Sequence, residues 1–407
     1  MKKVLLILSL CIPAFAFTQT WADLNSTITN DLDDVFFTDN NNGWAVGRQG
    51  KIVRTTNGGT TWLEQNSGTT KDLNKIFMVS TGAGYAVGDG GTVIKYNGTS
   101  WSALNISFSQ DMYGVFFLDA STGWVSGDWG CIKMTNDAGA TWTTQMSNSI
   151  YSNTFNDLHM LSETEGWAVG SSGRVLKYNG TNWTNVSSPA TANLDDLHGV
   201  SFTDSDEGFM CGESSGMYHW DGNSWSTYNT ALPNNSYHVY DVHMVSATLG
   251  YAAASPGFGG QGMVLKYNGN TWVKDYEYPG SGTELFTGIT STPNGNIYAV
   301  ANTGIIKTKS SGGTATGLIK NNNAINLSVY PNPFVSTFVF DFPVKEKGEV
   351  SLTIKDVTGK ILKSASEKQL LHGNYSIAID GSNLPSGIYF YTLTSSNFSQ
   401  TGKIIKN

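Results

Sequence analysis

One pattern returns about every 40 residues along the first three quarters of the chain. A tryptophan follows Ser, Thr or Asn at six places, with spacings of 39, 41, 41, 42 and 47 residues: Trp62, Trp101, Trp142, Trp183, Trp225 and Trp272. Earlier in five of these units stands a second motif, a glycine, an aromatic residue, two small or apolar residues and a glycine: 43–47, 84–88, 123–127, 166–170 and 208–212. A regular period of this length indicates one supersecondary unit repeated along the chain.

Each unit contains four short runs of strand-forming residues. In the first unit they are 32–37, 44–46, 51–54 and 60–63. Asn-Gly or Asp-Gly pairs separate the third run from the fourth at 57–58, 97–98, 179–180, 221–222 and 268–269, and we expect both residues of each pair to adopt positive φ. Four strands per 40 residues are typical of a β-propeller blade.

The number of blades follows from an incomplete unit. Residues 284–309 contain strand-like runs but no closing tryptophan, whereas Trp21 closes a unit that nothing precedes. We expect Trp21 to supply the outer strand of the last blade, which would leave no free sheet edge in the ring. The sequence therefore predicts an all-β chain in which residues 17–309 form a seven-bladed propeller closed by the N-terminal strand.

Composition excludes some functions. The net charge is −8 and the chain has only three arginines, Arg48, Arg54 and Arg174, which argues against a nucleic-acid partner. There is no phosphate loop, zinc-binding helix or serine nucleophile motif, so we expect no cofactor. A sialidase would need three converging arginines, and Arg48 and Arg54 lie in one blade.

The first residues have the features of a secretory signal peptide, assigned to residues 1–16. Lys2 and Lys3 precede an apolar run from Val4 to Phe17, and Ala14-Phe15-Ala16 fits signal-peptidase cleavage. The run is too short to span a bilayer, and we expect no transmembrane segment. The remaining cysteines, Cys131 and Cys211, lie in apolar runs of different units, which favours two buried thiols over a disulfide.

The last 80 residues form a second domain by composition. Residues 17–324 carry a net charge of −12 and residues 325–407 a net charge of +2. A stretch rich in Gly, Ser, Thr and Asn, residues 310–325, is the predicted linker. About seven short strand-like runs in 326–407 predict a small β-sandwich.

Loops between the second and third strands are the first candidates for ligand binding. They present Arg48, Asp89, Asp128, Trp129, Glu213 and Phe258. Exposed aromatic rings beside polar side chains are typical of surfaces that bind protein or glycan. The alternative is that Trp129 folds back onto the channel rim and that Phe258 plugs it.

Three neighbouring units carry an acid-x-His step near their first strand: 157–159, 196–198 and 241–243. Imidazole and carboxylate side chains at a channel mouth suit a divalent metal, so Asp157, His159, Asp241 and His243 are metal candidates. Aligned on the repeat, His198 stands three positions early and would not converge with the others. The alternative is that these polar residues hydrogen-bond to neighbouring blades.

The propeller repeats resemble a known family. Thr135 to Trp142 resembles an Asp-box turn, and Thr55 to Trp62 is a second copy with Asn57 in place of Asp. The body is similar to Asp-box propellers and to repeats of the photosystem II assembly-factor type. The resemblance implies the fold and leaves the activity open, because this turn occurs in propellers with unrelated functions.

The tail resembles the type A C-terminal sorting domain of the type IX secretion system of Bacteroidetes. The matching residues are Tyr330, Pro331, Asn332, Pro333, Gly387, Tyr389, Gly402, Lys403 and Lys406. The resemblance implies transport through the periplasm to the secretion machinery, and release from the cell or attachment to its surface. The alternative is a sandwich that binds cell wall or sugar.

These features predict an exported protein, secreted or on the outer-membrane surface, that binds an extracellular protein or glycan without catalysis. A secreted polysaccharide-active enzyme and a surface adhesion scaffold are the alternatives, since acidic residues are plentiful enough for a pair of catalytic carboxylates.

Overall fold

We describe a computed structural model of the chain. It describes residues 20–104, 106, 109–146, 153–257, 260–279, 284–310, 327–330, 334–344, 348–356, 360–370, 373–395 and 399–406. The predicted signal peptide, Phe258, Pro331, Asn332, Pro333 and all of the predicted linker except Ser310 lie outside these residues. The chain divides into two compact units, Met1–Gly312 and Gly313–Asn407.

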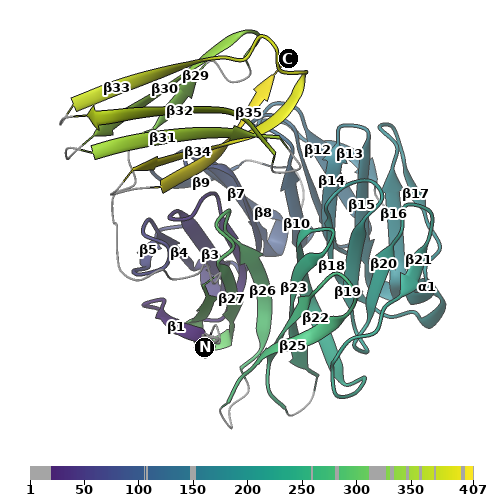
Figure 1. The fold of residues 1–407 in the computed structure, drawn as a ribbon. Coiled ribbons are helices and arrows are strands. Elements are labelled where there is room, and N and C mark those ends of the chain that lie inside the picture. Colours follow the sequence, from purple (N-terminus) through teal and green to yellow (C-terminus); the bar gives the residue numbers. More distant parts are fainter. Residues whose placement is uncertain are drawn as a thin grey trace, which may run out of the picture. The chain divides into compact units, whose positions relative to one another are not determined.

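The described part of the first unit forms seven four-stranded antiparallel sheets, here called blades 1 to 7. Figure 1 shows them arranged around a common centre. Blades 1 to 3 consist of β2 (Leu32–Phe37), β3 (Gly43–Gly47), β4 (Ile52–Thr55) and β5 (Leu63–Gln65); β6 (Leu73–Ser80), β7 (Ala83–Gly88), β8 (Thr92–Tyr96) and β9 (Trp101–Ala103); and β10 (Met112–Phe117), β11 (Gly123–Gly127), β12 (Cys131–Thr135) and β13 (Thr143–Met146).

Blades 4 to 6 follow the same order along the chain. They consist of β14 (Phe155–Ser162), β15 (Glu165–Gly170), β16 (Arg174–Tyr178) and β17 (Trp183–Asn185); β18 (Leu197–Phe202), β19 (Gly208–Gly212), β20 (Met217–Trp220) and β21 (Trp225–Thr227); and β22 (Tyr237–Ser246), β23 (Leu249–Pro256), β24 (Met263–Tyr267) and β25 (Trp272–Glu277). One short helix, α1 (Pro189–Asn193), precedes blade 5.

Blade 7 joins the two ends of this unit. It contains β26 (Phe286–Ser291), β27 (Ile297–Ala301) and β28 (Ile305–Lys309), and its fourth strand is β1 (Trp21–Asn25). Trp21 pairs with Lys309 and Asn25 with Ile305, so the N-terminal strand occupies the place that the sequence predicts for it. Blade 7 also contacts blade 1, since the Thr287 hydroxyl donates a hydrogen bond of 2.7 Å to the Leu32 carbonyl.

Apolar side chains between neighbouring blades form the core. The second strand of each blade is the most buried, because it lies between two sheets; all five residues of β3 are buried. In one such interface Trp44 and Val46 pack with Ile76 and Met78 of the next blade. Cys131 and Cys211 are both buried and free, as predicted.

The turns between third and fourth strands differ from the prediction. The glycine of each pair has positive φ, for example Gly98 and Gly180, but the Asn or Asp before it does not. Its side chain instead accepts hydrogen bonds from the turn: Asn97 Oδ1 accepts from Thr99 N at 3.0 Å and Ser100 N at 2.9 Å. An Asx-type bond of this kind closes the turn without a second left-handed residue.

The Thr-x-Asn/Asp turns also move the fourth strand. The sequence predicts this strand of blade 1 at residues 60–63, yet β5 begins at Leu63. The Thr55 hydroxyl accepts from Gly59 N at 2.9 Å, and Asn57 Oδ1 accepts from Thr61 N at 2.9 Å. These bonds hold residues 55–61 in the turn, and Trp62 is buried directly after it.

The second unit contains two antiparallel sheets. One consists of β29 (Ser328–Tyr330), β30 (Thr337–Val344) and β33 (Gly373–Asp380), and the other of β32 (Ile361–Leu370), β31 (Gly348–Lys355), β34 (Gly387–Ser395) and β35 (Ser399–Lys406). Their buried side chains share one core, as in a sandwich. The all-β prediction is therefore confirmed. Among the described residues no helix has the length and apolarity needed to cross a bilayer.

Several predicted sorting residues are part of this core or hold it together. Tyr389 is buried, and a side chain at Gly402 would collide with the Tyr391 ring. The Lys406 ammonium donates to the carbonyls of Gly381 and Ser382 at 2.8 and 3.0 Å. Gly387 and Lys403 lie on β34 and β35, and the exposed Tyr330 donates its hydroxyl proton to Asp341.

Candidate functional site

The first strands of the seven blades line a central pocket of about 250 Å³. Each of these strands is interrupted by a β-bulge near its start, so the residue after the bulge has the same register in every blade. We call these seven residues the charged layer: Asp34, Lys75, Gly114, Asp157, Gly199, Asp241 and Gly288.

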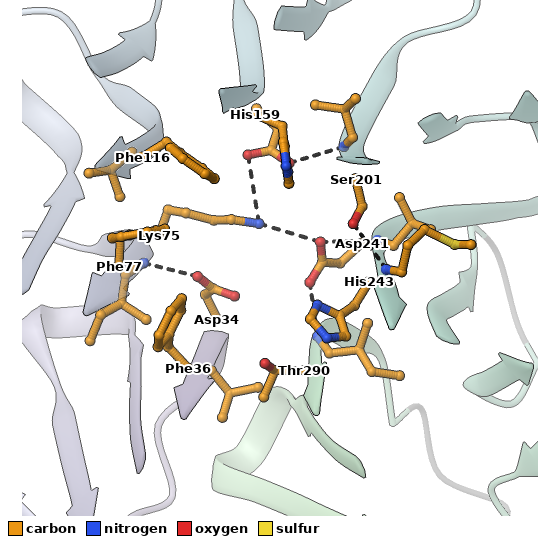
Figure 2. Close-up of a pocket in the computed structure, with 18 of the residues that line it drawn as sticks. Asp34, Phe36, Lys75, Phe77, Phe116, His159, Ser201, Asp241, His243 and Thr290 are labelled. Atoms are coloured by element: carbon orange, nitrogen blue, oxygen red, sulfur yellow. Dashed lines mark hydrogen bonds and ion pairs between the residues drawn. The ribbon is translucent and has the colours of Figure 1, made fainter. Parts of the chain in front are cut away.

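Lys75 is the one cation of the charged layer. Its Nζ lies 3.4 Å from Asp241 Oδ1 and 3.9 Å from Asp157 Oδ1 (Figure 2). Asp34 is the third carboxylate close enough to influence it. The layer therefore places three carboxylates around a single ammonium group.

Each carboxylate of the layer also joins two blades. Asp34 Oδ2 accepts from Ile76 N at 2.9 Å, Asp157 Oδ2 from Val200 N at 3.0 Å, and Asp241 Oδ2 from Ile289 N at 2.9 Å. In each case the donor is the first residue after the layer position of the next blade. Asp157 and Asp241 therefore form the hydrogen bonds between neighbouring blades that the sequence suggests as the alternative to a metal site.

Burial changes the proton affinity of these groups. It raises the pKa of Asp34 to about 7, against the opposing effect of Lys75, and the pKa of Asp157 to about 6. Burial disfavours the charged form of Lys75, but the carboxylates around it raise its pKa well above the usual value. The pKa values of Asp34 and Asp157 are raised first because both groups are buried, and then because Asp241 is a like charge nearby.

Two residues further along each first strand is a second ring, here called the mixed layer. Its members are Phe36, Phe77, Phe116, His159, Ser201, His243 and Thr290. The three phenylalanines are neighbours on one side, with ring centroids 5.1 and 4.8 Å apart, and polar side chains occupy the other side (Figure 2). The pocket thus has an aromatic wall and a polar wall in the layer next to the carboxylates.

Burial favours the neutral form of the two histidines of the mixed layer. Burial lowers the pKa of His159 to about 4 and also lowers that of His243. The His159 ring packs 4.9 Å from that of Phe116, and His243 Nε2 lies 2.8 Å from the Ser291 hydroxyl. Both line the pocket with Asp157 and Asp241, as the sequence suggests for a shared channel.

The predicted loop candidates that the structure describes lie beside the start of the first strands, whereas the mixed layer lies further along these strands. Arg48 and Asp89 begin the short 3-10 turns Arg48–Gly50 and Asp89–Gly91, and Asp128 and Trp129 occupy the corresponding loop of blade 3. Trp129 is 41% exposed, on a backbone with a φ of 60°. The described loop residues thus share one face, here called the loop face, but not the pocket.

Three of the loop candidates form ion pairs or hydrogen bonds with neighbouring side chains. The Arg48 guanidinium lies 2.8 Å from Asp72 Oδ2 and 3.4 Å from Asp33 Oδ2. Burial raises the pKa of Asp33 to about 7 although Arg48 opposes it. Asp89 accepts from Asn74 at 3.1 Å and Asp128 from the Thr154 hydroxyl at 2.7 Å.

Glu213 belongs to a different cluster. Among the described residues, one set of three possible metal ligands has all its ligand atoms within 4.8 Å of one another: His198, Glu213 and His238. Asp157, His159, Asp241 and His243 do not form such a set. Sequence reasoning missed His238, and it missed Asp34 and Lys75 of the charged layer. A position-by-position alignment of the repeats would place all three at the ring centre or its rim.

Known families match both the propeller and the tail of the chain. Residues 328–407 match the family model of the secretion system C-terminal sorting domain. The tail is a type IX sorting domain. It indicates export by type IX secretion to the cell surface or the extracellular space. Residues 14–109 and 65–179 match the model of the photosynthesis system II assembly factor YCF48, and among curated proteins none matches the chain.

Solved structures show the same propeller fold at low identity. YCF48 bound to D1 peptide is 19% identical, with a TM-score of 0.57 over 74% of this chain and all of that one. YCF48 from Cyanidioschyzon merolae is 16% identical, with a TM-score of 0.57 over 71% and 98%. PorZ, an essential surface component of the type IX secretion system of Porphyromonas gingivalis, is 13% identical, with a TM-score of 0.53. That match covers 93% of this chain and 59% of PorZ.

Proposed function

We propose that the chain is an exported, non-catalytic binding protein whose propeller holds a cationic side chain of an extracellular protein in the central pocket. The observation that carries the proposal is the pairing of an excess of carboxylates with an aromatic wall in one pocket. An acidic layer and a phenylalanine wall are the two surfaces that a lysine or arginine side chain requires.

The charge of the pocket supports a cation. Asp34, Asp157 and Asp241 outnumber Lys75 by three to one, and the raised pKa values of Asp34 and Asp157 mean that more positive charge would be favourable. A bound ammonium or guanidinium would reduce the excess of negative charge when the three carboxyl groups are ionised. Because the surroundings are poorly solvated, such an ion pair is stronger than one on an open surface.

The aromatic wall supports a side chain with an apolar stem. Phe36, Phe77 and Phe116 present ring surface next to the charged layer. A cation over such rings gains about 2 kcal/mol when it is desolvated. The methylene groups of lysine or arginine would pack on the same rings, while His159, Ser201 and Thr290 offer polar contacts on the opposite side.

The other uses of the carboxylates argue against catalysis. One oxygen of each accepts a backbone N–H of the next blade, and Asp157 and Asp241 also pair with Lys75. A polysaccharide-active enzyme would need a carboxyl group that is free to exchange a proton with its substrate. YCF48, a propeller of the same fold, has been solved bound to D1 peptide, which is compatible with a peptide ligand here.

Synthetic decapeptides that differ only at the central residue test the proposal. We expect peptides with lysine or arginine to bind at least about tenfold more tightly at pH 8 than the peptide with norleucine, about 1.4 kcal/mol. The Phe77→Leu and Phe116→Leu variants should reduce this preference, because the aromatic wall is weakened while the carboxylates remain, and Trp129→Ala on the loop face should retain it in full. Equal binding of all three peptides would reject the proposal.

A glycan ligand on the loop face is the second candidate. Trp129 is the observation that favours it, since an exposed indole can stack on a sugar ring. A glycan array probed with the same variants separates the two candidates. Glycan binding that disappears with Trp129→Ala and persists in Phe77→Leu would move the site to the loop face, and release of reducing sugar would favour the enzyme.

We propose that the sorting domain directs the propeller to the place where it acts, outside the cell. Removal of residues 328–407 should leave the propeller in the periplasm, because the sequence that the secretion machinery reads is then missing. Cell fractionation of the parent strain and of the truncated form measures this. Appearance of the truncated protein in the medium or on the surface would show that export does not depend on the tail.

A further inference from the structure

A second site lies on the loop face at the junction of blades 5 and 6, away from the central pocket. We propose that His198, Glu213 and His238 bind one divalent transition-metal ion, with Zn²⁺ as the type. His198 lies on β18, Glu213 in the loop after β19, and His238 on β22.

The geometry of the three side chains suits a metal. Their ligand atoms all lie within 4.8 Å of one another, and His238 Nδ1 is 3.7 Å from Glu213 Oε1. Ligand atoms of a tetrahedral zinc site are about 3.4 Å apart, given Zn–N distances of about 2.1 Å. Small side-chain rotations would therefore bring the three atoms to the required separation. Two imidazoles and a carboxylate form a known zinc ligand set that leaves a fourth position open.

Comparison with the other blades shows that His238 breaks a repeated contact. In four blades the corresponding residue is an aspartate that accepts a backbone N–H from the loop of the preceding blade. These pairs are Asp31 with Thr303 at 2.8 Å, Asp72 with Gln49 at 2.7 Å, Asp111 with Gly90 at 2.6 Å, and Asp196 with Ser172 at 2.7 Å. At the junction of blades 5 and 6 an imidazole takes the place of that carboxylate and faces Glu213 instead.

His198 breaks a second repeated contact at the same junction. In blades 2, 4 and 7 the corresponding residue donates a hydrogen bond to the first strand of the next blade. These bonds join Asn74 to Met112 O at 3.0 Å, Asn156 to Leu197 O at 2.7 Å, and Thr287 to Leu32 O at 2.7 Å. The enclosed Nε2 of His198 makes no such bond and has no protein partner.

The two departures meet at one place. Two positions that elsewhere join blades both carry imidazoles here, and both rings lie beside Tyr240, with centroids at 5.2 Å from His198 and 6.0 Å from His238. A nitrogen that is enclosed and unpaired is costly unless something binds it. A metal ion would satisfy His198 Nε2 and add a link between blades 5 and 6 beside the hydrogen bond of 2.7 Å from Ser215 N to the Tyr237 carbonyl.

Titration of the chelator-treated, tag-free protein with ZnCl₂ by calorimetry tests the site. We expect one ion per chain, and binding at least about tenfold weaker in the His238→Ala and Glu213→Gln variants, because loss of a ligand costs no less than loss of a group that orients one. The matched control is His219→Ala, which removes the imidazole that lies 2.9 Å from Glu207 in the same blade and should leave binding unchanged. Absence of stoichiometric binding, or equal binding in His238→Ala, would overturn the proposal.

Because His198 is largely enclosed, its replacement can also destabilise the fold, so the melting temperature of each variant is measured with and without Zn²⁺. Zn²⁺ should raise the melting temperature of the parent protein and of His219→Ala, and raise that of His238→Ala and His198→Gln by clearly less. A rise of the same size in all four proteins would also overturn the proposal. The test is independent of the central pocket, since binding of cationic peptides to that pocket should be the same with and without EDTA.

Discussion

The indole nitrogen of Trp21 donates a hydrogen bond of 2.9 Å to Asp275 Oδ2, joining residues that are 254 positions apart. Trp21 lies on the outer strand of blade 7 and Asp275 on that of blade 6. The same carboxylate accepts from the Lys309 ammonium at 2.6 Å. The outer strands of blades 6 and 7 are therefore linked to each other by a side-chain hydrogen bond, in addition to the backbone pairing of each strand within its own sheet.

Trp21→Phe should lower the free energy of unfolding by about 1 kcal/mol, because the ring contact with Tyr276 remains and one hydrogen bond is lost. Urea unfolding followed by circular dichroism measures this. Trp129→Phe, in a loop, is the control and should change little. A Trp21→Phe variant as stable as the parent would show that this bond does not strengthen the closure.

Asp34→Asn should become more favourable relative to the parent as the pH rises from about 4 to about 8. Burial raises the pKa of Asp34 in the folded state to about 7, so between pH 3.8 and 7 the folded state keeps a proton that the unfolded state has lost. Stability from this group is full below pH 3.8 and is lost as the pH rises toward 7. Asparagine does not titrate. Urea unfolding at pH 4.5 and pH 8 measures the difference, which would be the same at both values if Asp34 ionised normally.

His159→Phe should show the opposite dependence. Burial lowers the pKa of His159 to about 4, so the unfolded state binds a proton below pH 6.5 that the folded state refuses. Stability from the neutral ring is present above pH 6.5 and is lost as the pH falls toward 4. The variant should therefore gain stability relative to the parent between pH 6.5 and 4.5 in the same urea assay. A constant difference would mean that the ring is solvated.

Gly288→Ala should destabilise the propeller by about 2 kcal/mol, the usual cost of forcing an extra methyl group into a packed site. A Cβ atom at this position would lie 2.9 Å from the carbonyl oxygen of Asp33 and from the Cα of Asp34, both backbone atoms. Gly82→Ala is the matched control, since its nearest neighbour would be 3.9 Å away. Thermal unfolding of both variants decides the matter, and equal melting temperatures would contradict the close contact.

The repeat made the fold predictable because its signals are local. The Trp endings and the Gly–aromatic motif mark each blade in sequence, and the orphan Trp21 indicated the closing strand. The Asn-Gly turns were predicted with the wrong backbone conformation, because the motif does not reveal that Asn97 uses its own side chain to close the turn.

The candidate site was less predictable because its members meet only across the ring. Asp157 and Asp241 stood out by their neighbouring histidines, but Lys75 occurs once, in a different blade, and nothing local links it to them. Trp129 and Glu213 were found as loop residues. The partnership of Glu213 with His238 depends on where two blades meet, which no single motif encodes.

The pairing of Trp21 with Lys309 also sets the order in which the molecule can be completed. The first strand made has no partner until residues 305–309 follow, almost 300 residues later. Until then the backbone groups of β1 lack the strand with which they pair. A fragment that stops before Ile305 therefore cannot form the complete sheet of blade 7. Every strand from Trp21 to Lys309 is therefore needed for a closed ring, and loss of residues at either end of this range leaves blade 7 incomplete.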